Sequence, residues 1–288
     1  MVRSLALAHG QDVTDTLAAV GHEFAAATAV TRVDEAPDGT VTYATEVHDG
    51  WDIGGVANGG YLLALVGRAL VEFTGRPPLT VTGHYLKPGL PGPANVTVTP
   101  VRLGRRLATV TASLRRGDDE LIRVLATCGA ASDEPAVLVD GAPPALPPYE
   151  ACAPTPRGDE PPFPGLNDRL ANRLRPGDDG FRTGAVSGRA ELAGWFAFAD
   201  EAPIDEVALL LAADAFAPPI FNLTGAPGWV PTVELTVHVR ARPAPGPLRA
   251  RFHTHFVDGG LLSEDAELWD STGHLVAQSR QLALTPRP

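Results

Sequence analysis

One carboxylate lies in an apolar stretch and is the first candidate for chemistry in this sequence. Asp214 stands in "LLLAADAFAPP", next to a run of leucines. An unpaired carboxylate is costly to bury, and partial burial raises its pKa toward the range of a general base. The first half of the chain has no carboxylate between Asp52 and Glu72. Asp214 is therefore either a catalytic group, or a residue that faces a solvated gap or caps a local turn.

A glycine-rich stretch, "WDIGGVANGGYLLALVGRAL", occupies Trp51 to Leu70. Gly54 and Gly59 have the spacing of the ends of a phosphate-binding loop, but Gly60 and Tyr61 stand where Lys and Ser or Thr are required. The dinucleotide-binding pattern of glycines does not fit either. We expect these glycines to allow close backbone approach at the start of a buried helix.

Three other groups of reactive residues favour structural roles. His253 and His255 place two imidazoles on one strand face, but no third metal ligand follows at a usual spacing. Cys128 lies in a predicted strand without a basic neighbour, so we interpret it as a small buried residue. The absence of a Gly-x-Ser-x-Gly motif argues against an α/β-hydrolase. Four acidic residues are expected to be solvated hairpin charges: Asp258, Glu264, Asp265 and Glu267.

The elements around these residues form a repeat. In the first half a helix to about Phe73 is followed by four alternating stretches, which predict antiparallel strands. In the second half, "PIDEVALLLAADAFAPPIF" predicts a helix, with Pro203 and Asp205 in its first turn and Pro218–Pro219 at its end, and four strands follow again. His84 and His238 stand at matching points of the repeat, which favours an architectural role.

The remaining elements complete this plan. A short helix is expected near Asp12 to Ala26, a strand around Thr40 to Val47, and another strand in "GRAELAGWFAFA". A proline-rich segment from Pro135 to about Pro164 separates the halves, because proline at this density suits neither helix interiors nor central strands. The pattern predicts an α+β fold in which each half wraps a curved antiparallel sheet around a central helix.

Composition excludes several classes of protein. The chain has 288 residues, 44% of them hydrophobic, so it can bury a large core. Its net charge is −11, from 34 acidic and 23 basic residues, which argues against nucleic-acid binding. Two cysteines are too few for a disulfide scaffold. The first residues do not form a signal peptide and no stretch is long enough to span a membrane, so a cytoplasmic protein is expected.

Two stretches of the first half carry a family resemblance: "GGVANGGYLLALVGRAL" and "HYLKPGLPGPANVTVTPVRLGRRLATVTASL". Together with their order and their echo in the second half, they resemble the double-hotdog acyl-CoA thioesterases of the bacterial thioesterase II type. The resemblance covers roughly Gly21 to Ala283. It implies an N-terminal hotdog unit over 1–134, a proline-rich linker over 135–182 and a C-terminal hotdog unit over 183–288.

The resemblance also implies a hydrolytic site. In the thioesterases that the chain resembles, this site consists of an Asp, a Thr and a Gln, and the resemblance places these at Asp214, Thr232 and Gln281. The strand after Thr232 is one residue longer than the resemblance implies, which leaves Thr236 as an alternative, and Gln278 competes with Gln281.

In such a site the carboxylate takes a proton from a water that Thr232 and Gln281 orient, with no metal, cofactor or covalent nucleophile. Backbone N–H groups of Gly59, Gly60 and Tyr61, at a helix N-terminus, are expected to bind the thioester carbonyl. Arg105 and Arg106 are either contacts for coenzyme A phosphates or, preferably, a solvated turn.

The function expected from this resemblance is hydrolysis of an acyl-CoA to a free acid and coenzyme A. The alternative is a hotdog protein that binds acyl thioesters or another hydrophobic ligand without hydrolysis. A hotdog hydratase is disfavoured, because "GGVANGGY" contains no His. The expected partner is an acyl-CoA substrate, not nucleic acid or a membrane, with further association to a homodimer or higher homo-oligomer possible.

Overall fold

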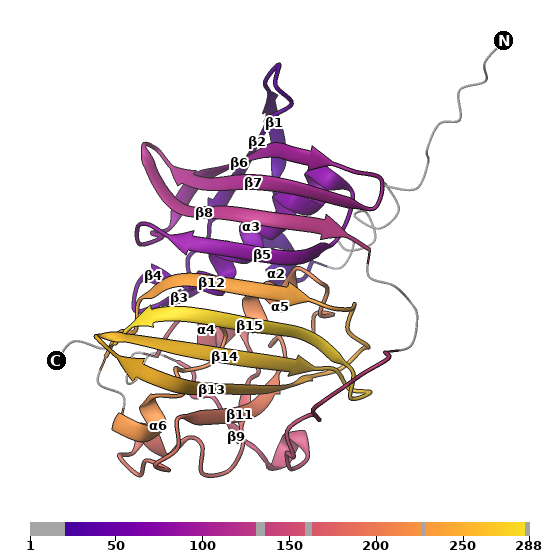
Figure 1. Ribbon diagram of the computed structural model, residues 1–288. Helices are drawn as coiled ribbons and strands as arrows, with labels where there is room; N and C mark the ends of the chain where they lie inside the picture. Colours follow the sequence, from indigo (N-terminus) through magenta and orange to yellow (C-terminus); the bar gives the residue numbers. More distant parts are fainter. Residues whose placement is uncertain (1–20, 131–135, 159–162, 226–227, 286–288) are drawn as a thin grey trace.

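The computed structural model describes residues 21–130, 136–158, 163–225 and 228–285. Within these ranges one long antiparallel sheet of thirteen strands runs through both halves of the molecule (Figure 1). In spatial order its strands are β1 (Thr31–Glu35), β2 (Val41–Val47), β6 (Gly92–Leu103), β7 (Leu107–Arg116), β8 (Asp119–Gly129), β5 (Pro78–Tyr85), β12 (Thr232–Val239), β15 (Leu275–Leu284), β14 (Leu261–Trp269), β13 (Leu248–Asp258), β11 (Glu191–Phe196), β10 (Arg173–Leu174) and β9 (Ala153–Pro154).

The two halves of the sheet meet where β5 pairs with β12. Thr82 lies directly opposite Thr236, and their hydroxyl groups are 2.9 Å apart in a hydrogen bond. On the other side of each strand, β5 pairs with β8 and β12 pairs with β15. The spatial order of the strands is therefore mirrored about the β5–β12 pair. His84 and His238 are both exposed and occupy equivalent positions of β5 and β12. This arrangement is the predicted α+β repeat.

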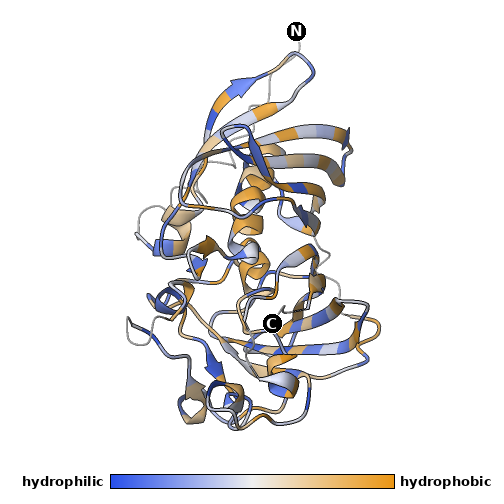
Figure 2. Ribbon diagram, turned by 90° about the vertical axis from the view of Figure 1, so that its left-hand side faces the viewer, coloured by the Kyte–Doolittle hydropathy of each residue, from blue (hydrophilic) through white to orange (hydrophobic). Residues whose placement is uncertain are grey.

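The central helix of the first half is α3 (Gly59–Thr74). Asn58 caps its N-terminus, because the side-chain oxygen of Asn58 accepts a hydrogen bond of 2.9 Å from the Tyr61 N–H. Gly75 ends it in the left-handed conformation, at φ 63°. The helix is apolar nearly all round because the sheet covers one side and the second half covers another (Figure 2). It thus buries its leucines where a surface helix would expose polar residues.

The second central helix is shorter than the sequence predicts. Helix α5 spans only Ala208–Ala212, and the chain before it is not helical. Asp205 starts the helix by accepting a hydrogen bond of 2.7 Å from the Ala208 N–H. Beyond Ala213 the backbone leaves the helix, since the carbonyl and carboxylate of Asp214 both bond to the start of α3. The prediction of a helix from Pro203 to the proline pair was therefore wrong in its extent.

The two central helices run antiparallel and touch through glycine. A Cβ added to Gly60 would lie 2.8 Å from the Cβ of Asp214, and one added to Gly67 would lie 3.5 Å from Val207. Only a residue without a side chain allows the start of α3 to come this close to the end of α5. The expectation of close approach at the glycine-rich stretch is confirmed at Gly60.

The other elements flank this core. They are α2 (Glu23–Ala27), the hairpin β3 (Asp52–Ile53) and β4 (Val56–Ala57), the short helices α4 (Leu166–Arg169) and α6 (Phe221–Thr224), and two 3₁₀ turns, Tyr149–Ala151 and Gly180–Arg182. Of the helix expected near Asp12 to Ala26, residues 12–20 lie outside the described ranges. The proline-rich region contributes β9 to the sheet at its far edge, next to β10. The proposed boundaries at 134/135 and 182/183 stay a prediction.

Candidate active site

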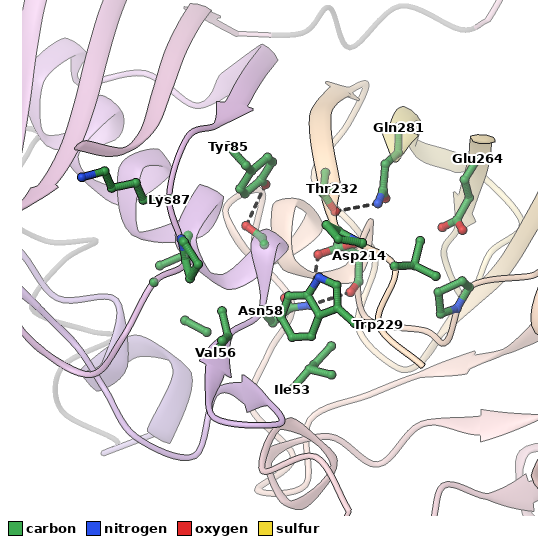
Figure 3. Close-up of a pocket in the computed structure, with 18 of the residues that line it drawn as sticks. Ile53, Val56, Asn58, Tyr85, Lys87, Asp214, Trp229, Thr232, Glu264 and Gln281 are labelled. Atoms are coloured by element: carbon green, nitrogen blue, oxygen red, sulfur yellow. Dashed lines mark hydrogen bonds between the residues drawn. The ribbon is translucent and has the colours of Figure 1, made fainter. Parts of the chain in front are cut away.

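A cavity of about 500 Å³ opens where the two halves meet. Its walls come from the start of α3, the end of β5, the segment after α5, and the strands β12, β14 and β15. Apolar side chains such as Leu62, Phe216 and Trp229 line much of it, and Asp214, Thr232 and Gln281 all face it (Figure 3). The three predicted catalytic side chains therefore line one cavity.

Asp214 is held by the first half of the chain (Figure 3). Its carboxylate oxygen Oδ2 accepts a hydrogen bond of 2.8 Å from the Gly60 N–H and one of 3.0 Å from the side-chain amide of Asn58. The same amide nitrogen of Asn58 donates to the backbone carbonyl of Asp214, at 2.9 Å. The carboxylate thus has a fixed orientation at the N-terminus of α3, where the helix dipole favours negative charge.

Burial and hydrogen bonding act on the Asp214 carboxyl in opposite directions. Burial raises its pKa from 3.8 to about 6, while hydrogen bonds from Gly60, Asn58 and Gly59 oppose part of this rise. A carboxylate with this pKa is largely ionised at neutral pH and remains a stronger base than an exposed aspartate. Both properties suit a general base.

Thr232 and Gln281 form a hydrogen-bonded pair beside Asp214. The side-chain amide of Gln281 donates to the hydroxyl oxygen of Thr232 at 2.7 Å (Figure 3). Since that oxygen accepts this bond, the Thr232 hydroxyl proton is free to donate to a third group in the cavity. No direct hydrogen bond joins this pair to Asp214 among the described residues, so a gap remains between the pair and the carboxylate.

The alternatives Thr236 and Gln278 lie away from the cavity. The Thr236 hydroxyl bonds to Thr82, and the Gln278 side chain accepts a hydrogen bond of 2.8 Å from Arg240. The extra residue in this strand is absorbed by an irregularity in the β12–β15 register just after Thr232. Such a bulge shifts the alternation of side chains between faces, and Thr232 joins the inner face.

The glycine amides have partners within the protein. The Gly60 N–H bonds to Asp214, the Tyr61 N–H bonds to Asn58, and neither residue lines the cavity. The Tyr61 side chain is fully buried in the first half, where its hydroxyl donates to the Ala27 carbonyl. The prediction that these amides bind a substrate carbonyl therefore does not hold for Gly60 and Tyr61 in this geometry. Gly59 does line the cavity.

Glu264 is a second carboxyl group in the cavity, and its prediction as a solvated hairpin charge was wrong. Its side chain is buried, with 6% exposed, and it lies directly opposite Gln281 on the neighbouring strand. Burial, together with the nearby charges of Asp214 and Asp265, raises its pKa well above the ordinary value. The signal was present in the sequence, because Leu262, Glu264, Ala266 and Leu268 alternate on one strand face.

Asn58 and Tyr85 are two further residues that the sequence reasoning did not assign to the site. Asn58 has the position and residue type of a helix cap, which is a readable signal. Tyr85 donates a hydrogen bond of 2.8 Å to the Gly59 carbonyl, and burial together with the charge of Asp214 raises its pKa. It therefore remains a protonated donor that supports the first residue of α3.

Comparison with known proteins agrees with this architecture. Residues 47–129 match the model of the acyl-CoA thioesterase N-terminal domain, and residues 149–285 match that of the C-terminal domain. The chain belongs to the acyl-CoA thioesterase family. The family resemblance and the double-hotdog fold predicted from the sequence are thus confirmed.

Solved structures share the fold over nearly the whole length of this thioesterase-family chain. A candidate thioesterase II of Thermobifida fusca YX is 30% identical, with a TM-score of 0.82 over 92% of this chain and 98% of its own. The acyl-CoA thioesterase II TesB2 of Mycobacterium marinum is 18% identical, with a TM-score of 0.64 over 92% and 98%. An uncharacterised protein of Mycobacterium tuberculosis H37Rv is 28% identical over 267 residues, 84% of this chain and 90% of that protein.

The thioesterase-family halves are not equivalent around the cavity. The two halves are related by an approximate two-fold rotation, which places α5 on α3. This rotation places Val207 on Gly60 and Asp214 on Gly67, so the Gly60–Asp214 contact corresponds to the Gly67–Val207 contact. Gly67 is therefore the first-half counterpart of Asp214. The counterpart position thus carries no carboxylate.

The strand positions differ in the same way. Leu235 pairs with Gln281, and the equivalent Val81 pairs with Ala126, so Ala126 is the counterpart of Gln281. The counterparts of Asp214 and Gln281 in the other half are therefore a glycine and an alanine, in line with the absence of a first-half carboxylate between Asp52 and Glu72.

Other groups weighed in the sequence lie outside the cavity. Arg105 and Arg106 are exposed in the turn between β6 and β7. Cys128 is buried, as predicted, and burial raises the pKa of its thiol.

No helix in the described ranges has the length and apolar character needed to cross a membrane.

The histidine pair has a neighbour that its spacing did not reveal. Ligand atoms of His253, His255 and Asp265 lie within 4.8 Å of one another on the outer face of the sheet. The Asp265 carboxylate is already bound through both oxygens by Arg280, at 2.6 and 2.8 Å. The third ligand expected to be absent is thus present, but it is engaged in an ion pair.

Proposed function

We propose that this protein hydrolyses an acyl-CoA thioester to a free carboxylic acid and coenzyme A. The observation that carries the proposal is the placement of Asp214, with a pKa of about 6, in one cavity with the Thr232–Gln281 pair. Membership of the acyl-CoA thioesterase family supports the reaction class.

Water is the nucleophile in this mechanism. Once the Gln281 amide has donated to the Thr232 hydroxyl oxygen, the Thr232 hydroxyl proton remains, and it donates to one lone pair of the water oxygen. Gln281 holds Thr232 in this orientation. The water in turn donates to the Asp214 carboxylate. The other lone pair of the water is left to attack the thioester carbonyl carbon, and its direction is set by the contacts of the water with Thr232 and Asp214.

Asp214 moves the proton. As the water oxygen bonds to the carbonyl carbon, the Asp214 carboxylate takes the proton and the carbonyl oxygen gains negative charge. When the carbon–sulfur bond breaks, the thiolate of coenzyme A leaves and the proton on Asp214 neutralises it. The positive end of the α3 dipole lies at this end of the cavity and stabilises the negative charge that develops.

The walls of the cavity suit the rest of the substrate. The apolar side chains, including Leu62, Phe216 and Trp229, provide a surface for an acyl chain. Lys87, the one lysine of the chain, lines the cavity as well. Its ammonium group is exposed and pairs with Asp119, so the phosphates of coenzyme A would compete with that carboxylate for its positive charge.

The test is the hydrolysis of a panel of acyl-CoAs with different chain lengths, followed by the release of free thiol. We expect the wild type to hydrolyse at least one of them and Asp214→Asn to lose most of the rate. Asp258→Asn is the matched control, because Asp258 is exposed at the end of β13. A wild type inactive on every chain length, but able to bind acyl-CoA, would favour the non-catalytic binding protein instead.

A further inference from the structure

Three polar side chains form a row across the inner face of the second half. Thr254 on β13 lies directly opposite Glu264 on β14, and Glu264 lies directly opposite Gln281 on β15. Residues opposite each other in antiparallel strands project from the same face, so their side chains are neighbours. Glu264 and Gln281 both line the cavity. The row therefore reaches from the interior of the sheet to the proposed catalytic pair.

The two ends of this row have unpaired polar atoms. The Gln281 side-chain oxygen Oε1 and the Thr254 hydroxyl oxygen are both buried without a hydrogen-bond partner. The Glu264 carboxyl between them makes none of the side-chain hydrogen bonds found in the described part of the chain. A buried polar atom without a partner is costly, so these two atoms call for a partner on the carboxyl between them, which lines the cavity.

A protonated Glu264 can complete the contacts of Gln281 in the amide orientation that the structure has. Gln281 Oε1 can only accept, so its neighbour must donate; an ionised carboxylate cannot donate, whereas a protonated carboxyl group can. The second oxygen of a protonated Glu264 can accept the Thr254 hydroxyl proton after a rotation of the side chains, since the structure has no hydrogen bond between the two. In the opposite amide orientation the Thr232 hydroxyl would donate to Gln281 Oε1 and would have no proton left for the water, so a donor at Glu264 favours the orientation that the structure has.

Building on the proposed thioesterase reaction, we propose that Glu264 is a positioning residue. As a neutral acid it donates to Gln281 Oε1 and so fixes the Gln281 amide with its N–H side toward Thr232, which leaves the Thr232 hydroxyl proton for the attacking water. Glu264 acts through Gln281 and does not itself take the water's proton, which goes to Asp214.

The charges around Glu264 agree with a neutral acid. Asp214, Tyr85 and Lys87 line the same cavity, and Asp265 follows Glu264 on β14 with its side chain on the outer face, bound to Arg280. Burial and the two aspartates raise the pKa of Glu264 well above its ordinary value. Burial raises the pKa of Asp214 only to about 6, since hydrogen bonds stabilise its ionised form. The two carboxyl groups are therefore set to opposite protonation states over an intermediate pH range.

The pH dependence of hydrolysis follows from these two states. The rate rises as Asp214 loses its proton, and it falls at higher pH when Glu264 loses its proton and repels the Gln281 oxygen. A glutamine at position 264 donates an N–H to the same oxygen at every pH. Glu264→Gln should therefore keep the rate at neutral pH and remove the fall at higher pH that Glu264 causes.

The experiment compares kcat and KM across pH for the wild type, Glu264→Gln and Glu264→Met. Methionine has similar length and cannot donate, so we expect kcat to fall about tenfold or more, the effect of one lost hydrogen bond, with KM little changed. Glu267→Gln is the control, because Glu267 is on the same strand and pairs with Arg251. Thermal unfolding of each variant separates loss of fold from loss of rate.

The outcomes decide between the two proposals. If the wild type is active and Asp214→Asn is not, but Glu264→Met keeps the wild-type kcat and pH profile, the role of Glu264 is wrong and the thioesterase proposal stands. If the wild type hydrolyses no acyl-CoA, infrared spectroscopy still tests Glu264 directly. A protonated-carboxyl band at neutral pH that Glu264→Gln removes and Asp214→Asn keeps supports the neutral acid, and its absence from the wild type overturns it.

Discussion

Removing the charge of Asp214 should stabilise the protein while it stops hydrolysis. The pKa of this carboxyl is raised from 3.8 to about 6 in the folded protein, which means that folding disfavours its ionised form. A pKa difference of about two corresponds to about 3 kcal/mol. Because the group faces a cavity that water can enter, this figure is an upper limit. Asparagine keeps the oxygen that accepts from Gly60 and carries no charge.

The stabilisation has a defined pH dependence. Between pH 3.8 and about 6 the folded wild type binds more protons at Asp214 than the unfolded chain does, so its free energy of unfolding falls as pH rises. Below pH 3.8 the carboxyl is protonated in both states and the penalty is absent. Asp214→Asn does not titrate, so its advantage over the wild type should grow through this window and stay constant above pH 6.

Urea unfolding of the wild type and Asp214→Asn at pH 3.5, 5 and 7.5 measures this difference, with Asp258→Asn as the control. We expect a gain of about 1 to 3 kcal/mol at pH 7.5 for Asp214→Asn and a much smaller one at pH 3.5. Equal gains at all three pH values would refute the reasoning, because the effect would then come from packing and not from the charge. A loss of stability at pH 7.5 would show that the bonds to Gly60 and Asn58 outweigh burial.

Three further changes test the same geometry. Gly60→Ala should cost about 3 kcal/mol in urea unfolding, because its Cβ would lie 2.8 Å from that of Asp214, whereas Gly21→Ala, with no atom within 4 Å, should change little; equal costs would contradict the packing argument. Thr232→Val should lower kcat about 100-fold through loss of water orientation, and Thr236→Val should not; the reverse would assign the role to Thr236. Asn58→Ala removes a donor to Asp214, so the acidic limb of kcat/KM against pH should move to higher pH, and an unmoved limb would show that this bond does not set the pKa.

The sequence predicted the repeat and the site more fully than the contacts within the site. Alternation and apolar periodicity are local properties, so the strands and α3 could be read directly. The length of α5 could not, because it depends on Asp214 bonding to a segment more than 150 residues earlier in the chain. The partners of the glycine amides were missed for the same reason.

Glu264 shows a different limit. Its alternation with Leu262 and Ala266 marked an inward position, yet its charge suggested a solvated turn. Whether Glu264 is buried or solvated depends on the strands on either side of β14. Only the strand register shows that Thr254 and Gln281 lie opposite Glu264. The bulge after Thr232 is similar, since a single extra residue in a strand is visible only against its paired neighbour.

The joining of two like halves in one chain has a consequence for how such a site can vary. In a dimer of identical subunits each substitution enters both copies of a cavity, so a residue that suits the base must also be tolerated at the mirror position. Here Gly67 and Ala126 stand where Asp214 and Gln281 have their counterparts, and each position varies alone. The half that lacks the base still supplies its Asn58 and Gly60 donors. A cut in the proline-rich segment should therefore leave two inactive fragments that regain hydrolysis only when they reassemble.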